Sequence, residues 1–478
     1  MRKLVPLVSG LLFSALLLLP QYLFAADGHA TLPQNLSIYW IIPFVCMLLS
    51  IAIAPLTIPH FWEHHFGKVS IFWALAFLIP CAISFGPGVA IHEFLHAILT
   101  DYMPFIILLF SLFTVAGGVR LKGSLVGTPV VNTGILAVGT VLASWMGTTG
   151  AAMLLIRPIL RANEHRKYRV HSVVFFIFLV ANIGGSLSPL GDPPLFLGFL
   201  KGVPFFWTTT HLFVKTLCAA AILLALYFVL DTILYAREGK PVPPKKEGEV
   251  ERLGLDGKVN LILLAGIVAA VLLSGVLNFG TWISLNGIHL EGQNILRDLC
   301  LLLIAALSWR LTDPHSRVLN NFTWGPILEV AKLFFGIFLS MIPAIAILRA
   351  GTNGALASVI NLVTHEGQPI NSMYFWLTGA LSSFLDNAPT YLVFFNTAAA
   401  GGGSVAHLLG EWAPTLAAIS AGAVFMGANT YIGNAPNFMV RSIAEEQGVA
   451  MPSFFGYMLW SGLILLPLFA LLTFLFFM

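Results

Sequence analysis

Ile183-Gly-Gly-Ser-Leu-Ser-Pro-Leu-Gly-Asp-Pro-Pro194 interrupts a long apolar segment, and Gly427-Ala-Asn-Thr-Tyr-Ile-Gly-Asn-Ala-Pro-Asn437 interrupts a second one in the same way. Proline lacks the amide hydrogen that a helix needs, and glycine accepts non-helical dihedral angles, so each stretch predicts a helix broken in its middle. At membrane depth, the carbonyl groups freed by such a break need an ion or a polar neighbour. The two stretches therefore predict polar sites inside an apolar protein.

The composition places both stretches in a membrane protein. Of the 478 residues, 58% are hydrophobic and only 9% are charged, whereas a soluble globular chain carries about 25% charged residues. The formal net charge of +3 is too small to indicate a nucleic acid or another anionic partner. These values exclude a soluble enzyme and a nucleic-acid-binding protein, and they predict an all-α polytopic membrane protein.

The N-terminus has the pattern of a secretory signal peptide. Arg2 and Lys3 precede an apolar run, and small residues ending at Ala26 resemble a cleavage site. We therefore expect residues 1–26 to be a signal peptide, with an uncleaved first transmembrane helix as the alternative. Either arrangement places residues 27–34 outside the cytoplasm.

Basic clusters predict the topology, because loops rich in Lys and Arg remain cytoplasmic. Such clusters lie at 120–122, 157–169, 237–258 and 310–317. Counting spans from an outside N-terminus places all of them on the cytoplasmic side only if two segments enter and leave the membrane on one face. These segments are 130–156 and 371–400, which we interpret as re-entrant hairpins.

The two halves of the chain share one plan. A linker, 237–257, separates a first half, 38–236, from a second half, 258–478. The first half contains the hairpin 130–156 and the broken helix 170–199; the second contains the hairpin 371–400 and the broken helix 412–445. Paired hairpins and broken helices on opposite faces are typical of an inverted-repeat transporter. The alternative is two unrelated helices that happen to be rich in Gly and Pro.

Side chains that offer oxygen ligands gather at the hairpin tips and helix breaks, and small cations prefer such ligands. The predicted ion- or substrate-binding residues are Ser144, Thr148, Thr149, Ser188, Asp192, Ser383, Asp386, Asn387, Thr390, Asn429, Thr430 and Asn434. A carboxylate at membrane depth is costly and indicates function. Such a group could exchange a proton for Na⁺. The alternatives are a kinked helix whose polar groups satisfy one another, and an Asp386 that only caps a helix.

The segment His92-Glu93-Phe94-Leu95-His96 matches the HExxH motif, which binds Zn²⁺ in metalloproteases. The motif needs a third ligand, and the sequence offers none in a supporting context. Because Pro87 and Pro104 flank it, we interpret this segment as an interfacial amphipathic arm. An intramembrane zinc protease remains the enzyme alternative; the expected protein is not an enzyme and needs no cofactor or structural metal.

At Leu385-Asp386-Asn387 and at the paired Gly-Asp-Pro-Pro and Gly-Asn-Ala-Pro-Asn breaks, the sequence resembles the ion transporter superfamily. The stretches 145–158 and 188–198 are most similar to its NhaD-like branch of sodium:proton antiporters and citrate transporters. The resemblance covers residues 38–478. It implies a homodimer with a scaffold part and a transport part, and binding sites at the two hairpin tips beside the broken helices.

The substrate is expected to be a cation. Anion symporters of this superfamily carry a Ser-Asn-Thr signature at both hairpin tips, which is absent here, and no Lys or Arg lies within either tip or break. We therefore expect a Na⁺/H⁺ antiporter of the inner (cytoplasmic) membrane, working by alternating access, in which Na⁺ and H⁺ compete at Asp386 and Asp192. The alternative is a Na⁺-coupled carrier of citrate or another small carboxylate; membrane lipid is the remaining expected partner.

Overall fold

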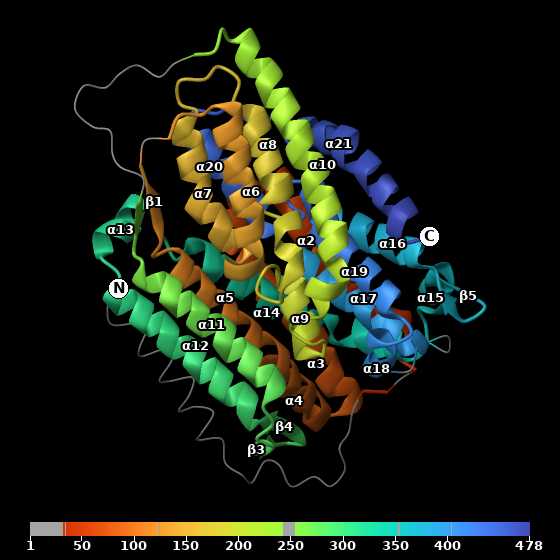
Figure 1. Cartoon of the computed structure of the whole chain (residues 1–478). Coiled ribbons are helices and arrows are strands. Elements are labelled where there is room, and N and C mark those ends of the chain that lie inside the picture. The colour runs from red at the N-terminus through yellow and green to blue at the C-terminus, as the bar shows by residue number, and fades with distance from the viewer. Residues whose placement is uncertain (1–31, 34, 124, 242–253, 352–353, 403) are drawn as a thin grey trace.

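The computed structural model describes residues 32–33, 35–123, 125–241, 254–351, 354–402 and 404–478. The predicted signal peptide and most of the predicted linker lie outside the described residues. Within those ranges, nine helical segments are long and apolar enough to cross a membrane. The prediction of an all-α polytopic membrane protein is confirmed (Figure 1).

The nine segments and the remaining elements have the following bounds. The nine are η2–α2 (Ile38–Thr57), α3 (Pro59–Phe85), α4–η3–α5 (Pro87–Ala116), α6 (Pro129–Met146), α8–η4 (Val170–Leu187), α10 (Trp207–Arg237), α11 (Val259–Val276), α14 (Gly325–Arg349) and α21 (Phe454–Phe476). The other helices are α7 (Thr148–Ala162), α9 (Pro193–Leu200), α12 (Gly292–Leu311), α13 (Pro314–Leu319), α15 (Ala357–Val363), α16 (Asn371–Phe384), α17 (Asn387–Gly402), α18 (Val405–Leu409), α19 (Ala413–Met426), η6 (Gly427–Asn429) and α20 (Ala435–Glu446). Three antiparallel ribbons pair β1 (Arg120–Lys122) with β2 (Gly254–Asp256), β3 (Thr281–Leu285) with β4 (Ile288–Glu291), and β5 (Thr364–His365) with β6 (Gln368–Pro369).

The helices form two groups. In the first group, α3 packs against α2 and α14, while α12 packs against α5 and α11 (Figure 1). In the second group, α6 packs against α7 and α10, and α16 packs against α17 and α19. The two groups meet where α14 contacts α17. The hairpins and broken helices therefore all belong to the second group.

Each predicted hairpin is a pair of helices joined by a short break. Gly147 separates α6 from α7 and has a φ of 80°, a backbone conformation that favours glycine. Leu385 and Asp386 separate α16 from α17. The predicted broken helices are interrupted between α8 and α9, and between α19 and α20, within the two stretches that the sequence singled out.

The segment that carries the HExxH motif differs from its prediction. Instead of a separate arm, α4 continues through the π-helical stretch η3 (Ala97–Tyr102) into α5 (Met103–Ala116). Pro104 lies in the first turn of α5, directly after η3. Because a π-helical turn is wider than an α-helical turn, it relieves the clash that a proline ring would otherwise make. Pro104 therefore lies inside one continuous helical segment, Pro87–Ala116, instead of bounding a separate arm.

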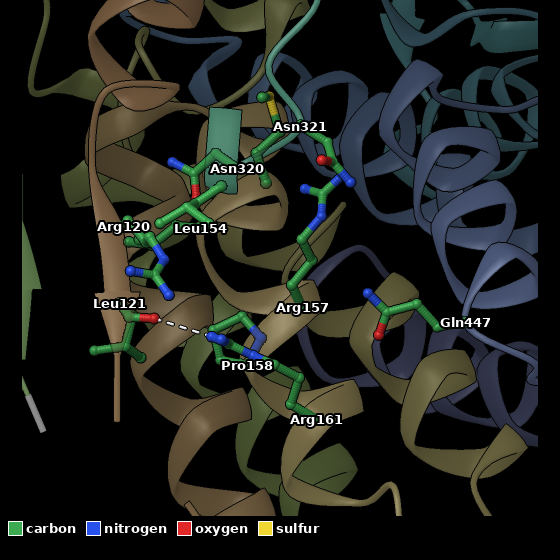
Figure 2. Close-up of a pocket in the computed structure, with 11 residues that line it drawn as sticks. Arg120, Leu121, Leu154, Arg157, Pro158, Arg161, Asn320, Asn321 and Gln447 are labelled. Carbon is green, nitrogen blue, oxygen red and sulfur yellow. Dashed lines mark hydrogen bonds between the residues drawn. The ribbon is translucent and has the colours of Figure 1, made fainter. Parts of the chain in front are cut away.

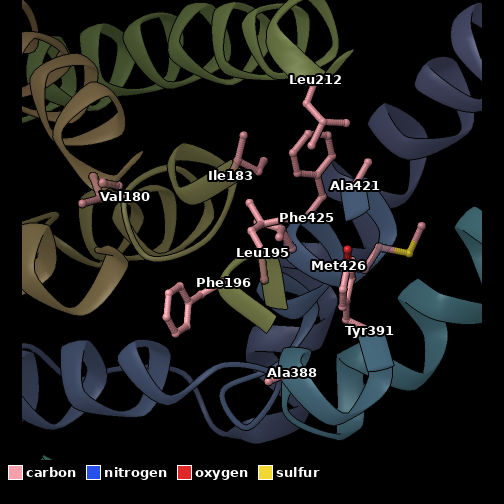
Figure 3. Close-up of a cluster of buried hydrophobic side chains, with 14 of the residues drawn as sticks. Val180, Ile183, Leu195, Phe196, Leu212, Ala388, Tyr391, Ala421, Phe425 and Met426 are labelled. Carbon is pink, nitrogen blue, oxygen red and sulfur yellow. The ribbon is translucent and has the colours of Figure 1, made fainter. Parts of the chain in front are cut away.

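A buried apolar core surrounds the helix breaks. Ile183 of η4 and Leu195 of α9 lie beside Phe425 of α19 (Figure 3). All three are at most 1% exposed. Polar groups within the breaks therefore have no bulk water to bind, and they have to satisfy one another or bind an ion.

Candidate functional site

Asp192 is the residue on which the helix breaks converge. Its side chain is 1% exposed and lies directly before α9. Its Oδ1 accepts hydrogen bonds from Thr148 Oγ1 and Asn434 Nδ2, both at 3.1 Å, and its Oδ2 accepts one from Asn387 Nδ2 at 2.6 Å. Thr148 opens α7, Asn387 opens α17 and Asn434 precedes α20. One carboxylate thus links both hairpins and both broken helices.

The amide of Asn387 is itself oriented by a neighbour. The Oγ of Ser382, in the last turn of α16, donates to Asn387 Oδ1 at 2.6 Å. The Nδ2 of Asn387 consequently faces Asp192. Ser382 and Asn387 are completely buried, so water does not compete for the hydrogen bonds that fix this orientation.

Matching hydrogen bonds build the two sides of the site. The Ser188 hydroxyl donates to the carbonyl of Ser144, and Thr430 Oγ1 donates to the carbonyl of Ser383 at 2.5 Å. Ser144 Oγ in turn donates to the carbonyl of Gly184 at 2.5 Å, and Ser383 Oγ lies 3.1 Å from the carbonyl of Met426. In each half, a hydroxyl of the broken helix therefore ties that helix to the tip of its hairpin.

Glycine permits the close approach of each hairpin tip to its broken helix. A Cβ added at Gly185 would lie 2.6 Å from Thr148 Cγ2, and one added at Gly427 would lie 2.2 Å from Asn387 Oδ1. Each glycine stands three positions before the hydroxyl residue of its break, Ser188 or Thr430. Thr148 and Asn387, the two hairpin residues that donate to Asp192, therefore each pack against a glycine.

Two buried asparagines that the sequence analysis did not single out connect the broken helices. Asn182 Nδ2 donates to Asn437 Oδ1 at 2.7 Å, and Asn182 Oδ1 accepts from Asn434 at 3.2 Å. Asn437 Nδ2 donates to the carbonyls of Gly427 and Thr430. Both are fully buried. The available signal was an amide side chain within an otherwise apolar segment.

Asp386 lies beside this cluster without a hydrogen bond to Asp192. Its Oδ1 accepts from the backbone N–H of Ala388 at 3.1 Å, and its carbonyl accepts from Thr390 Oγ1 at 3.1 Å. Asp386 therefore caps the start of α17. Asp386 nevertheless stands one position before Asn387, whose Nδ2 donates to Asp192 Oδ2.

The remaining predicted residues lie near the site but do not reach Asp192. Asn429 Nδ2 donates to Ser383 Oγ at 2.9 Å, while its Oδ1 is buried without a hydrogen-bond partner among the described residues. Thr149 is half-buried, and the described contacts include no hydrogen bond from its hydroxyl. Of the twelve predicted residues, Thr148, Asn387 and Asn434 therefore contact Asp192, and the other eight shape the hairpin tips and the helix breaks.

The HExxH motif lines a different cavity. His92, Glu93 and His96 face a space of about 350 Å³ that Lys201 and Arg349 also line. His92 Nδ1 lies 2.9 Å from the carbonyl oxygen of Asn286. Across the part of the chain that the structure describes, no three His, Cys, Asp or Glu side chains are grouped to hold a metal ion. The protease interpretation therefore gains no metal site from these residues.

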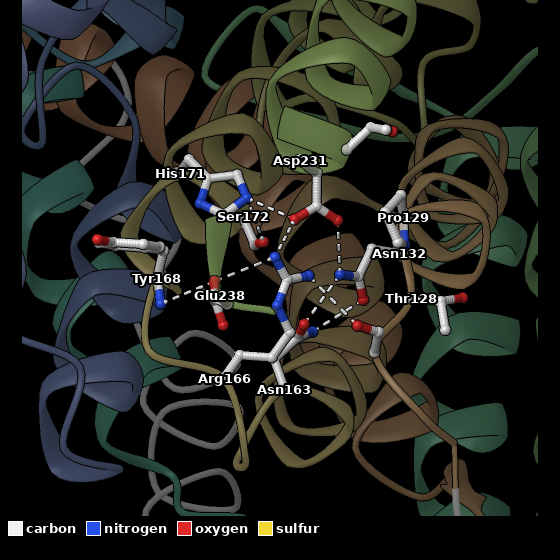
Figure 4. A network of polar contacts seen from close by, with 12 residues as sticks. Thr128, Pro129, Asn132, Asn163, Arg166, Tyr168, His171, Ser172, Asp231 and Glu238 are labelled. Atoms are coloured by element: carbon white, nitrogen blue, oxygen red, sulfur yellow. Dashed lines mark hydrogen bonds and ion pairs between the residues drawn. The ribbon is translucent and has the colours of Figure 1, made fainter. Parts of the chain in front are cut away.

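A buried polar network lies away from the Asp192 site (Figure 4). Arg166 Nη2 is 2.8 Å from Asp231 Oδ1, and His171 Nε2 is 2.8 Å from the same oxygen. Asn132 Nδ2 donates to Asp231 Oδ2 at 3.0 Å. The network joins α6, α8 and α10 with the loop after α7, so Arg166 is buried although it belongs to a basic loop.

These features define an integral membrane protein built as a secondary transporter: helices of membrane-spanning length, two hairpins, and a polar site enclosed at their breaks. A family model described as putative citrate transport matches residues 33–477. The chain belongs to this transporter family, and the resemblance to the citrate-transporter branch is confirmed. No curated protein matches the chain.

Proposed function

We propose that the protein is a Na⁺/H⁺ antiporter in which Na⁺ and H⁺ bind in turn to Asp192. The observation that carries the proposal is the enclosure of this carboxylate by donors from three separate helix breaks. Among the described contacts of Asp192, no Lys, Arg or His side chain neutralises it. A carboxylate buried without a cationic partner favours either a bound proton or a bound metal cation.

The surrounding side chains suit a small hard cation. The Thr148 hydroxyl oxygen and the Asp192 carboxylate are oxygen ligands, and rotation of the Asn387 or Asn434 amide would exchange a donor for a carbonyl oxygen. Protonation of Asp192 would instead add one O–H donor to the cluster. The same residues can thus accommodate either cation, which is the requirement for competition.

Asp386 contributes a second negative charge at the same hairpin tip. Because Asp386 immediately precedes Asn387, which donates to Asp192, a cation bound between the two carboxylates would be balanced by both negative charges. Its position at the N-terminal end of α17 also places it where a helix favours negative charge. We assign Asp386 to the ion site together with Asp192.

Alternating access follows from an inverted repeat. The matching Ser188–Ser144 and Thr430–Ser383 contacts support descent of the two halves from one unit. In this proposal, both hairpins are re-entrant and move with the broken helices as the transport part. The group containing α3, α5, α12 and α14 is the scaffold part of a homodimer in the inner membrane.

A Na⁺-coupled citrate carrier is the second candidate, favoured by the description of the family. The helix N-termini at α7, α9, α17 and α20 could receive carboxylate groups. Against this candidate, neither tip and neither break contains Lys or Arg to neutralise a tricarboxylate. The remote protease alternative would require bound zinc that is lost when His92 and His96 are changed.

The test is dissipation of a pH gradient in proteoliposomes with an acidified lumen. Na⁺, Li⁺ and K⁺ are added in turn, followed by citrate. The proposal predicts that Na⁺ alone makes the lumen more alkaline, because Na⁺ entry is exchanged for exit of H⁺. If no cation changes the luminal pH and labelled citrate is taken up only with Na⁺, the protein is a Na⁺-coupled citrate carrier and not an antiporter.

A further inference from the structure

A basic cavity of about 160 Å³ lies apart from the Asp192 site (Figure 2). Its walls come from α7, from β1, from the segment after α13 and from the end of α20. Arg120, Arg157 and Arg161 line it together with Asn321 and Gln447, and the described residues of its lining include no Asp or Glu. The cavity has room for about five water molecules at about 30 Å³ each, which suits one small polar group.

Arg157 has donors that the described residues leave unused. Its Nε and Nη1 atoms are buried and have no hydrogen-bond partner among those residues. In Figure 2 its side chain extends from α7 toward Asn321. Glu446 is near enough to attract the guanidinium, but it does not line the cavity. Unpaired buried donors on a charged group are costly, and an anion in the cavity would satisfy them.

The two other arginines are held at the edge of the cavity by the protein itself. Arg120 Nη1 lies 3.3 Å from Asp256 Oδ2, and Arg161 Nη2 donates to the carbonyl of Leu121 at 3.1 Å. A hydrogen bond from Lys122 lowers the pKa of Asp256, so this carboxylate is ionised and offsets part of the Arg120 charge. Arg157 therefore supplies the unpaired donors of the cavity.

We propose that this cavity is a binding site for a phosphate group. The planar guanidinium fork binds phosphate through paired hydrogen bonds, and the arginines adjoin one small cavity with no Asp or Glu among the described residues that line it. The phosphate could belong to a soluble metabolite or to a phospholipid headgroup. Because α7 lies in one helix group and the segment after α13 adjoins the other, a bound phosphate would contact both groups.

The first experiment measures thermal unfolding of the purified full-length protein in detergent, with inorganic phosphate or chloride at equal ionic strength. The proposal predicts that phosphate raises the Tm of the wild-type protein by several degrees. Arg157→Gln should lose this rise. Arg310→Gln is the matched control, because Arg310 is exposed at the end of α12 and does not line the cavity; it should keep the rise.

A second variant guards against misfolding of Arg157→Gln. Arg157→Lys keeps the charge but lacks the planar guanidinium group, so its apparent affinity for phosphate should fall at least several-fold.

A second experiment compares nanodiscs of phosphatidic acid with nanodiscs of a neutral lipid. A Tm rise specific to phosphatidic acid and dependent on Arg157 would assign the site to a lipid headgroup, and a rise with inorganic phosphate alone would assign it to a soluble ligand. An equal rise in wild type and Arg157→Gln, or no rise with either source, would overturn the proposal.

Discussion

Two carboxylates with different surroundings dominate the site at the level of single residues. Asp192 accepts three side-chain hydrogen bonds from other elements, whereas Asp386 accepts one from the backbone of its own helix. Asn434 occupies the place in the second broken helix that Asp192 occupies in the first. The two broken helices therefore contribute to the site in similar ways, but only the first supplies a carboxylate at this position.

Asp386→Asn separates the capping role of Asp386 from its charge. Asparagine caps helix N-termini about as well as aspartate, so the variant should keep its expression level and its Tm. Removal of the negative charge should abolish Na⁺/H⁺ exchange if Asp386 belongs to the ion site. The measurement is pH-gradient dissipation by Na⁺ in proteoliposomes, and wild-type exchange by the variant would remove Asp386 from the site.

Asp231→Asn tests whether the network around Arg166 is structural. The substitution leaves the buried guanidinium with Glu238, at 3.4 Å, as its carboxylate partner, and breaking a buried ion pair costs up to about 3–5 kcal/mol. We expect a lower Tm and a smaller free energy of unfolding in denaturant titrations. As a control, Asp256→Asn on the partly exposed β1–β2 ribbon should cost about 0–1 kcal/mol. Equal effects from both substitutions would argue against the structural role.

At the level of elements, the contacts between hairpin tips and broken helices depend on glycine. Gly185→Ala should displace Thr148 and Gly427→Ala should displace Asn387, because the added methyl groups would overlap these side chains. We expect each variant to lower the apparent affinity for Na⁺ by at least about tenfold, which corresponds to about 1.4 kcal/mol. The measurement is the Na⁺ dependence of the exchange rate.

Gly134→Ala provides the matched control for these variants. Gly134 lies in α6 of the first hairpin, and a Cβ added there meets no atom within 4 Å. Alanine is also the better helix former, so this variant should keep its Na⁺ affinity. Unchanged Na⁺ affinity in Gly185→Ala and Gly427→Ala would show that the close approach does not determine the site.

The sequence predicted the helix breaks well because their cause is local. Proline and glycine act on the backbone where they stand, so the interruptions before Pro193 and before Pro436 follow from the residues themselves. The contacts of Asp192 are not local: Asn387 is 195 positions away and Asn434 is 242 positions away. The sequence could identify Asn387 and Asn434 as candidate site residues, but it could not predict that both donate hydrogen bonds to Asp192.

The interpretation of the HExxH segment as a separate arm, flanked by Pro87 and Pro104, did not anticipate a continuous helical segment. A proline predicts the end of a helix when the preceding turn is α-helical, but the preceding turn here is π-helical. Nothing in the pattern of residues 97–102 distinguished the two turns. The buried position of Arg166 was also missed, because its partner Asp231 lies in a different helix and basic residues in a short loop are usually solvated.

On the scale of the whole molecule, functional and structural polar groups are separated. The Asp192 cluster lies at the hairpin tips and helix breaks, the Arg166 network joins the beginnings of α6 and α8 to the end of α10, and the Arg157 cavity opens between the two helix groups. This separation allows each cluster to be changed without direct contact with the others. Variants at the three places should therefore have distinct effects on transport, stability and phosphate binding.

The most direct test of the account is Na⁺-driven proton movement by Asp192→Asn in proteoliposomes, compared with wild type and with Asp256→Asn. Asparagine preserves the shape of the side chain but can neither carry the negative charge nor exchange a proton. The account predicts that Asp256→Asn exchanges Na⁺ for H⁺ like wild type, whereas exchange by a folded Asp192→Asn falls by at least about 100-fold, or about 2.7 kcal/mol. Wild-type Na⁺-driven proton movement by Asp192→Asn would contradict it.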